Sequence, residues 1–255
     1  MSAENLGMAI GWRVYGLSVM AVALVCFKWG GFDPGQPVPE GFPARAALGY
    51  AAAVVMLVAG AAVEWRQTAA WGAAALTAYF GLLVVVLMYG RVLLTHYAEY
   101  GPYESGAEQL AVAAAGLIVY ASFARIDPAL ARRLTRTGRL LFGVCALIWG
   151  GAHFVYMNLT APLVPKWLPP SQVFWGYATG AGFVAAGVAL LTGVRARLAA
   201  ILLTCMIASF TLLVHARMLL ADHSSHFNWT ELTANLCVLG AAWVVADSLA
   251  PHRSF

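Results

Sequence analysis

Residues 211–231 read TLLVHARMLLADHSSHFNWTE, an apolar helical stretch that runs into a polar segment rich in histidine. An earlier stretch, residues 81–104, reads GLLVVVLMYGRVLLTHYAEYGPYE and has the same layout. When Arg91 is aligned with Arg217 and Glu104 with Glu231, the two stretches overlay with a slip of one residue. The chain therefore contains this feature twice, which predicts two related halves.

Further matches extend the repeat toward the start of each half. Trp149-Gly150-Gly151 repeats Trp29-Gly30-Gly31, and Gly176-Tyr177 repeats Gly49-Tyr50. The predicted organisation is a first four-helix unit, a basic cytoplasmic linker and a second four-helix unit, at residues 1–124, 125–137 and 138–255 respectively.

Composition places the chain in a membrane. Of its 255 residues, 62% are hydrophobic and 10% are charged, and the mean hydropathy is +0.76, which excludes an ordinary soluble domain. A helix needs about 20 apolar residues to cross the hydrocarbon core. The sequence predicts an all-α polytopic membrane protein with eight transmembrane helices, near residues 12–30, 46–64, 70–90, 107–124, 138–157, 173–192, 198–220 and 231–249.

Charge distribution predicts the orientation. Because each half has an even number of spans, both halves point the same way as parallel repeats. The side that carries the N-terminus collects ten of the fifteen basic residues, so the positive-inside rule places both termini in the cytoplasm of a bacterium and the histidine-rich loops on the periplasmic or extracellular side of the inner membrane. The net charge of +4 thus reflects topology, and we expect no nucleic-acid partner.

The repeated arginines and glutamates are the first candidates for a binding site, because an ionisable residue within a span is costly. Arg91 and Arg217 either extend their guanidinium groups to the outer interface or bind an anionic or quinone-like ligand there. Glu104 and Glu231 either are acids favoured by a helix N-terminus or pair with the two arginines.

Two histidines add to this set. His215 precedes Arg217 by two residues and is deep enough that we expect it to be neutral and hydrogen-bonded. His153 follows Gly150-Gly151, where small residues let a helix or a flat ligand approach closely. Either histidine could ligate haem, but neither has a histidine counterpart in the other half, so haem is the less favoured ligand. We expect a polar pocket lined by Arg217, His215 and Glu231 with His153 and Trp149, and a degenerate second pocket with Arg91 and Glu104.

Asp222, His223 and His226 form a D-H-x-x-H pattern that suits zinc or copper. The run is expected in a loop, and the corresponding loop of the first half has only His96 with Glu99. Ordinary interfacial residues are therefore the favoured interpretation, and a metal site stays an alternative.

A set of motifs in the second half carries a family resemblance: His153-Phe154, residues 164–169 (VPKWLP), Trp175-Gly176-Tyr177 with Thr179-Gly180, Gly187, and residues 197–200 (RLAA). The chain resembles two fused units of the DoxX-like family of four-helix membrane proteins, over residues 138–249 and more weakly over 12–124. The resemblance implies a quinone- or redox-linked accessory role at the outer face.

No P-loop, dinucleotide-binding fingerprint or nucleophile elbow is present in the sequence, and we expect no catalytic activity of the chain's own. The predicted function is an accessory membrane subunit with an outward-facing pocket, associated with a redox enzyme or a larger membrane complex. Two alternatives stay open: a structural or assembly subunit of such a complex, and a carrier of a small lipophilic or anionic solute.

Overall fold

The computed structural model describes residues 10–250, and all regular secondary structure within that range is helical. Eight spans are long and apolar enough to cross a membrane, which confirms the predicted all-α polytopic fold. Six spans are single helices: α1 (Gly11–Trp29), α2 (Arg45–Val63), α5 (Gly101–Phe123), α6 (Pro128–Val155), α8 (Gln172–Thr192) and α11 (His226–Ser248). Two are composite: α3 (Ala69–Ala78), η2 (Tyr79–Tyr89) and α4 (Gly90–Thr95) form one, and α9 (Ala196–Phe210), η4 (Thr211–His215) and α10 (Ala216–Ala221) form the other. The short α7 (Met157–Thr160) and η3 (Ala161–Leu163) connect α6 to α8.

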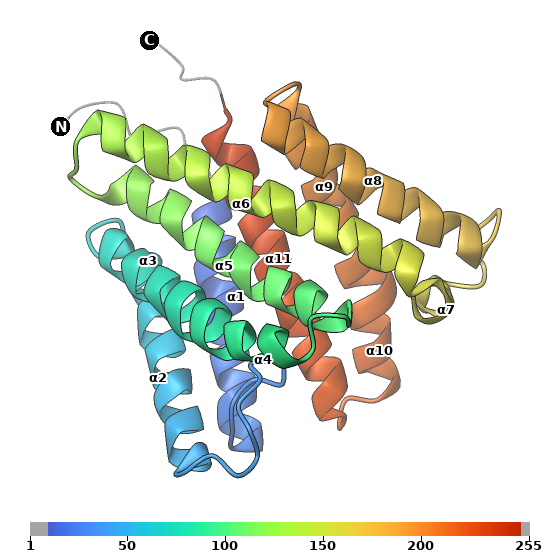
Figure 1. Ribbon diagram of the computed structural model, residues 1–255, viewed down its shortest axis with the longest axis horizontal. Helices are drawn as coiled ribbons and strands as arrows, with labels where there is room; N and C mark the ends of the chain where they lie inside the picture. The colour runs from blue at the N-terminus through green and yellow to red at the C-terminus, as the bar shows by residue number, and fades with distance from the viewer. Residues whose placement is uncertain (1–9, 251–255) are drawn as a thin grey trace.

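The spans form a closed bundle. Each packs against the span before it and the span after it, and α11 packs against α1. Figure 1 shows α1, α5 and α11 in the middle, with α2 and α3 on one side and α8 and α9 on the other. These three central spans are also the most buried, and α5 contacts α11 directly. The two halves of the sequence therefore share one core.

Small residues let the central helices approach closely. A Cβ atom at Gly240 of α11 would lie 2.8 Å from the Cα atom of Tyr15 in α1, a separation that real side chains do not reach. The same helix pair is joined at its end, where the Gly11 amide donates to Asp247 Oδ2 over 2.9 Å. Packing of this kind drives helix association in lipid, where burial of apolar area gains little.

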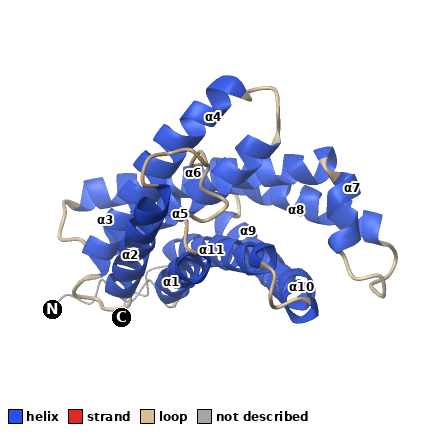
Figure 2. Cartoon of the chain, turned by 90° about the horizontal axis from the view of Figure 1, so that it is seen from below, coloured by secondary structure: helices blue, strands red, loops and turns tan. Residues whose placement is uncertain are grey.

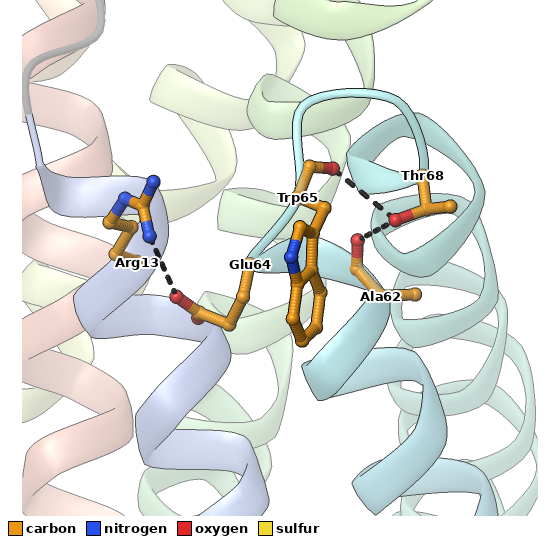
Figure 3. A network of polar contacts seen from close by, with 5 residues as sticks. All are labelled: Arg13, Ala62, Glu64, Trp65 and Thr68. Carbon is orange, nitrogen blue, oxygen red and sulfur yellow. Dashed lines mark hydrogen bonds and ion pairs between the residues drawn. The ribbon is translucent and has the colours of Figure 1, made fainter.

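Polar contacts hold the α1–α2–α3 corner at the end of the bundle where α1 begins (Figure 3). Arg13 Nη1 lies 3.8 Å from Glu64 Oε2, and the Thr68 hydroxyl donates to the carbonyl of Ala62 over 2.7 Å. Partial burial raises the pKa of Glu64, while the nearby Arg13 guanidinium lowers it. The pair thus ties the start of α1 to the turn between α2 and α3.

The basic run predicted as a linker at residues 125–137 is mostly helical, because α6 begins at Pro128. Asp127 is its N-cap, and one carboxylate oxygen accepts from the amides of Ala129 and Leu130 over 2.8 and 3.0 Å. Asp followed by Pro is a strong helix start. Helices α5 and α11 likewise begin several residues before their predicted starts, since hydropathy does not register polar first turns.

Each composite span contains a π-helical segment, and the two segments end at matching places. η2 ends at Tyr89 and η4 at His215, which are 126 residues apart (215 − 89), the same separation as Arg91 and Arg217. π-helical turns often occur at functional sites because they re-aim the side chains around them.

Candidate functional site

A cavity of about 570 Å³ lies in the second half of the bundle. Its walls come from α8 on one side and from the end of α9 and η4 on the other, and α5, α6 and α11 complete it. Helix α8 packs against α9, but α10 lies apart from α7 and α8 (Figure 2). The cavity is therefore wedged between diverging helices, at the end of the bundle opposite the start of α1.

Five of the seven predicted ligand-binding residues line this one cavity: Trp149, His153, His215, Glu231 and Glu104. They come from four different spans. The sequence placed Glu104 in a separate, degenerate pocket, and the structure differs on this point. Because α5 and α11 contact each other at the centre of the bundle, the corresponding acids of the two halves open into the same space.

The two predicted arginines do not line the cavity. Arg217 is exposed, and its Nη1 donates to the Leu213 carbonyl of its own span over 3.1 Å. Arg91 in α4 is also exposed. Within residues 10–250 neither arginine forms an ion pair with Glu104 or Glu231. Neither arginine therefore takes the place in the pocket that the sequence predicted, and Arg217 bonds to the preceding turn of its own span.

His153 is fixed between α6, α8 and α9. Its Nδ1 lies 3.2 Å from the Gly176 carbonyl oxygen and 3.1 Å from the Thr179 hydroxyl. Its ring packs with those of Phe183 and Phe210 in a cluster of three, with centroids 5.3 and 6.3 Å from the histidine and 6.1 Å from each other. If Nδ1 donates to the carbonyl, Nε2 is the unprotonated nitrogen of a neutral ring.

Two buried ring nitrogens at the cavity have no hydrogen-bond partner among the described residues: Trp149 Nε1 and His215 Nδ1. Trp149 is 6% exposed and is held edge-on to Phe142 and Phe183 at 5.7 and 5.8 Å. The hydrogen bond expected for His215 is therefore not made by Nδ1. Unpaired buried polar groups are uncommon and costly, and each calls for an explanation. Both residues line the cavity through other atoms, while the two nitrogens are shielded from its space, so a ligand could reach them only after the rings turn.

Sequence reasoning missed Glu108 and Asn235, which also line the cavity. They lie one turn after Glu104 and Glu231, and thus on the same faces of α5 and α11. Asn235 is held by a 2.6 Å bond from its Nδ2 to the Thr211 hydroxyl. The signal was present in the sequence as a polar pair at i and i+4 in both halves.

The cavity contains carboxyl groups and, apart from two histidines, no basic side chain among the residues that the structure describes. Glu104, Glu108 and Glu231 are half-buried, and no lysine or arginine lines the cavity within the described range. Asp33 interacts electrostatically with Glu108 and Glu231, so the four acids form one cluster at the junction of the two halves.

In the first half, the loop after α1 fills the corresponding space and forms hydrogen bonds with the side chains there. The loop after α1 folds inward and buries Asp33 and Gln36. Tyr89, the counterpart of His215, donates to the Gly35 carbonyl over 2.7 Å, and Tyr79 donates to Gln36 Oε1 over 2.7 Å. Burial raises the pKa of Asp33 to about 6, although a bond from the Gly35 amide acts in the opposite direction. The open site is thus in the second half.

The structure does not gather Asp222, His223 and His226 as metal ligands. Asp222 Oδ1 accepts from the Ser224 hydroxyl over 2.6 Å and from its amide over 3.0 Å, and these bonds lower the pKa of Asp222. His226 instead stacks on Trp29, with ring centroids 4.7 Å apart. Between residues 10 and 250 no group of three or more His, Cys, Asp or Glu side chains is arranged to hold a metal ion.

No family model, curated protein or solved structure matches this chain.

Proposed function

We propose that this integral membrane protein binds a quinone, or a lipophilic compound with similar carbonyl groups, in the cavity between α8 and η4. The observation that carries the proposal is the cavity itself, whose walls are largely apolar and aromatic with a few polar groups among them. Trp149 Nε1 and His215 Nδ1, which are unpaired and shielded from the cavity in this structure, would act as donors once their rings turn toward a bound molecule. The indole N–H can only donate, and a neutral imidazole can present an N–H at Nδ1. A quinone offers two carbonyl acceptors on a flat ring, which suits two such donors.

The shape and lining of the cavity also fit a flat lipophilic molecule. Aromatic side chains, among them Trp175, Phe183 and Phe210, line it together with aliphatic ones. Its volume of about 570 Å³ falls within the usual range of about 300–1,000 Å³ for small-molecule sites. An anionic ligand fits poorly because Glu104, Glu108 and Glu231 face it without a cation. The same carboxyl groups could exchange protons with a bound quinol.

The DoxX-like resemblance agrees with this role, and we extend the proposal to an accessory, redox-linked subunit of the bacterial inner membrane. The carboxyl groups make the anionic solute of the carrier alternative unattractive. An assembly subunit needs no ligand, so ligand binding separates it from the present proposal.

The test is quinone binding by the purified protein. We expect quinone to co-purify with the wild type and to rebind after extraction, and we expect the double variant Trp149→Phe/His215→Phe to bind it about 30-fold more weakly, since two hydrogen bonds of about 1 kcal/mol each are lost. Arg217→Ala is the matched control and should bind like the wild type.

Full affinity in the double variant would refute the cavity as the site. A Soret band in the purified protein would instead assign His153 and His215 to haem, and co-purification of a large enzyme with no quinone would favour the assembly role.

A further inference from the structure

The first helix pair of each half crosses at matching glycines. A Cβ added at Gly60 of α2 would lie 3.0 Å from the Gly16 carbonyl oxygen of α1. A Cβ added at Gly187 of α8 would likewise lie 2.9 Å from the Gly143 carbonyl oxygen of α6. Each glycine of the first pair is 127 residues before its counterpart in the second (143 − 16 and 187 − 60). Side chains at matching places in the two halves can therefore be compared directly.

In the first half, the loop after α1 brings two carbonyl oxygens to the span that contains η2. The Gly35 carbonyl accepts from the Tyr89 hydroxyl, and Gln36 Oε1 accepts from the Tyr79 hydroxyl, each over 2.7 Å. Both tyrosines belong to η2. The Gln36 amide also approaches Met56 of α2, with its Nε2 3.8 Å from the sulfur. The first half thus binds carbonyl groups that its own loop supplies.

The loop of the second half does not fill the matching space. His215 corresponds to Tyr89 and lines the cavity. The loop reads APLV at residues 161–164, so it has no polar side chain there. Two of its carbonyl groups accept from the Gln172 side chain of α8. The loop is therefore bonded to α8, and within residues 10–250 His215 Nδ1 lacks a partner like the one that Tyr89 has.

We infer that the ligand takes the place that the loop fills in the first half, and that one of its carbonyl oxygens accepts from His215 as the Gly35 carbonyl accepts from Tyr89. The imidazole supplies this N–H once its ring turns toward the cavity. The inference rests on the function proposed above and adds the orientation of the ligand, with a carbonyl group at η4.

The other end of the site suits an apolar group. Met206 stands at the place of Tyr79, 127 residues later (206 − 79), and lines the cavity. A thioether has no hydrogen to donate, so the second donor of the first half is absent at this position. We therefore place the apolar part of the ligand against Met206 and its carbonyl end nine residues further along the same span (215 − 206).

The test compares two substitutions that differ by one hydroxyl. His215→Tyr introduces the donor that the first half uses, and His215→Phe has the same ring without it. Binding of 2,3-dimethyl-1,4-naphthoquinone would be measured in lipid nanodiscs. We expect His215→Tyr to bind it within about twofold of the wild type and His215→Phe about fivefold more weakly, since one hydrogen bond is lost.

Two controls separate this bond from general effects on the cavity. The hydrocarbon 2,3-dimethylnaphthalene has no carbonyl group and should bind equally to both variants. Tyr89→Phe removes the matching hydroxyl in the first half, where the loop occupies the space, and should leave quinone binding unchanged. Thermal melts would confirm that each variant is folded. Should His215→Tyr fail to fold, His215→Gln and His215→Met, similar in length with and without an N–H, provide the same comparison.

Equal quinone binding by the variants with and without a donor would show that the inference is wrong, and the proposed function would stand. The same conclusion follows if the hydrocarbon distinguishes the two variants as strongly as the quinone does. If the folded wild type binds no quinone at all, the proposed function itself fails and the inference fails with it.

Discussion

Trp149 combines a closely packed ring with a buried N–H that has no partner among the described residues. Its ring packs against Phe142 and Phe183, but its N–H has no partner within the described structure. Trp149→Phe keeps most of the aromatic packing and removes the unpaired donor, which relieves a desolvation cost of about 1–3 kcal/mol but leaves a smaller ring. We expect the ligand-free variant to unfold within a few degrees of the wild type in a thermal melt. Trp149→Ala, which removes the packing as well, should melt far lower; equal losses in both variants would contradict this account.

Asp33 offers a test based on pH. Its ordinary pKa is near 3.8, and burial raises this to about 6 in the folded protein. Between these values the folded state binds more protons than the unfolded state, so stability falls as pH rises through this window and the penalty is complete above about pH 6. Asp33→Asn removes the charge and can still accept from the Gly35 amide through its side-chain oxygen.

We therefore expect Asp33→Asn to be more stable than the wild type by about 2 kcal/mol near pH 7.5, with the difference shrinking toward pH 4. Chemical or thermal unfolding in detergent at several pH values measures it. Asp222→Asn is the control, because Asp222 is exposed and its hydrogen bonds with Ser224 lower its pKa, so Asp222→Asn should not be stabilising near pH 7.5. A difference between Asp33→Asn and the wild type that does not change with pH would contradict the assignment.

At the residue scale, aligning the two halves predicted correctly that the two glutamates face a cavity, but it did not predict which side chains interact. Aligning the halves singled out Glu104 and Glu231, and both face the cavity. The same alignment singled out Arg91 and Arg217, whose long side chains extend to the surface instead. Sequence spacing fixes where a Cα lies on a helix, but the direction of a flexible side chain depends on what surrounds it.

At the scale of the element, the start of α6 shows what a single cap contributes. Asp127 accepts from two amides that would otherwise lack partners at the exposed first turn. Asp127→Ala should lower the free energy of unfolding by about 1 kcal/mol, whereas Asp127→Ser, which can still cap, should lose less than half of that. Thermal or denaturant unfolding of the two variants measures the difference. Equal stability of Asp127→Ala and the wild type would show that solvent replaces the cap at no cost.

The π-helical segments could not be predicted from the sequence. Both lie in long apolar stretches, residues 79–89 and 211–215, where hydropathy predicts an uninterrupted helix. A π turn is set by tertiary contacts that accommodate an extra residue, and it leaves no characteristic composition. In this protein η4 carries His215, which lines the cavity.

For the molecule as a whole, hydropathy predicted the number and the order of the spans because the bilayer imposes one length on every helix. It could not show which helices become neighbours. The contact of α5 with α11 brings the acids of both halves together, and the inward fold of the loop after α1 satisfies one half while the other stays open. These features arise from packing between residues that are distant in the sequence, which no local pattern encodes.

The orientation of the whole molecule in the membrane yields the last prediction. The turn between α2 and α3 and the basic start of α6 lie at one end of the bundle, and the loop between α10 and α11 lies at the other (Figure 1). Since basic loops stay on the cytoplasmic side, a cysteine at the exposed position 67 should face the cytoplasm and one at the exposed position 223 should face outward. In a background where the exposed Cys205 is replaced by alanine, a membrane-impermeant maleimide added to intact cells should label His223→Cys and leave Gln67→Cys unlabelled until the cells are lysed. The reverse pattern would place the ligand cavity at the cytoplasmic face, and labelling of both from outside would contradict the eight-span topology.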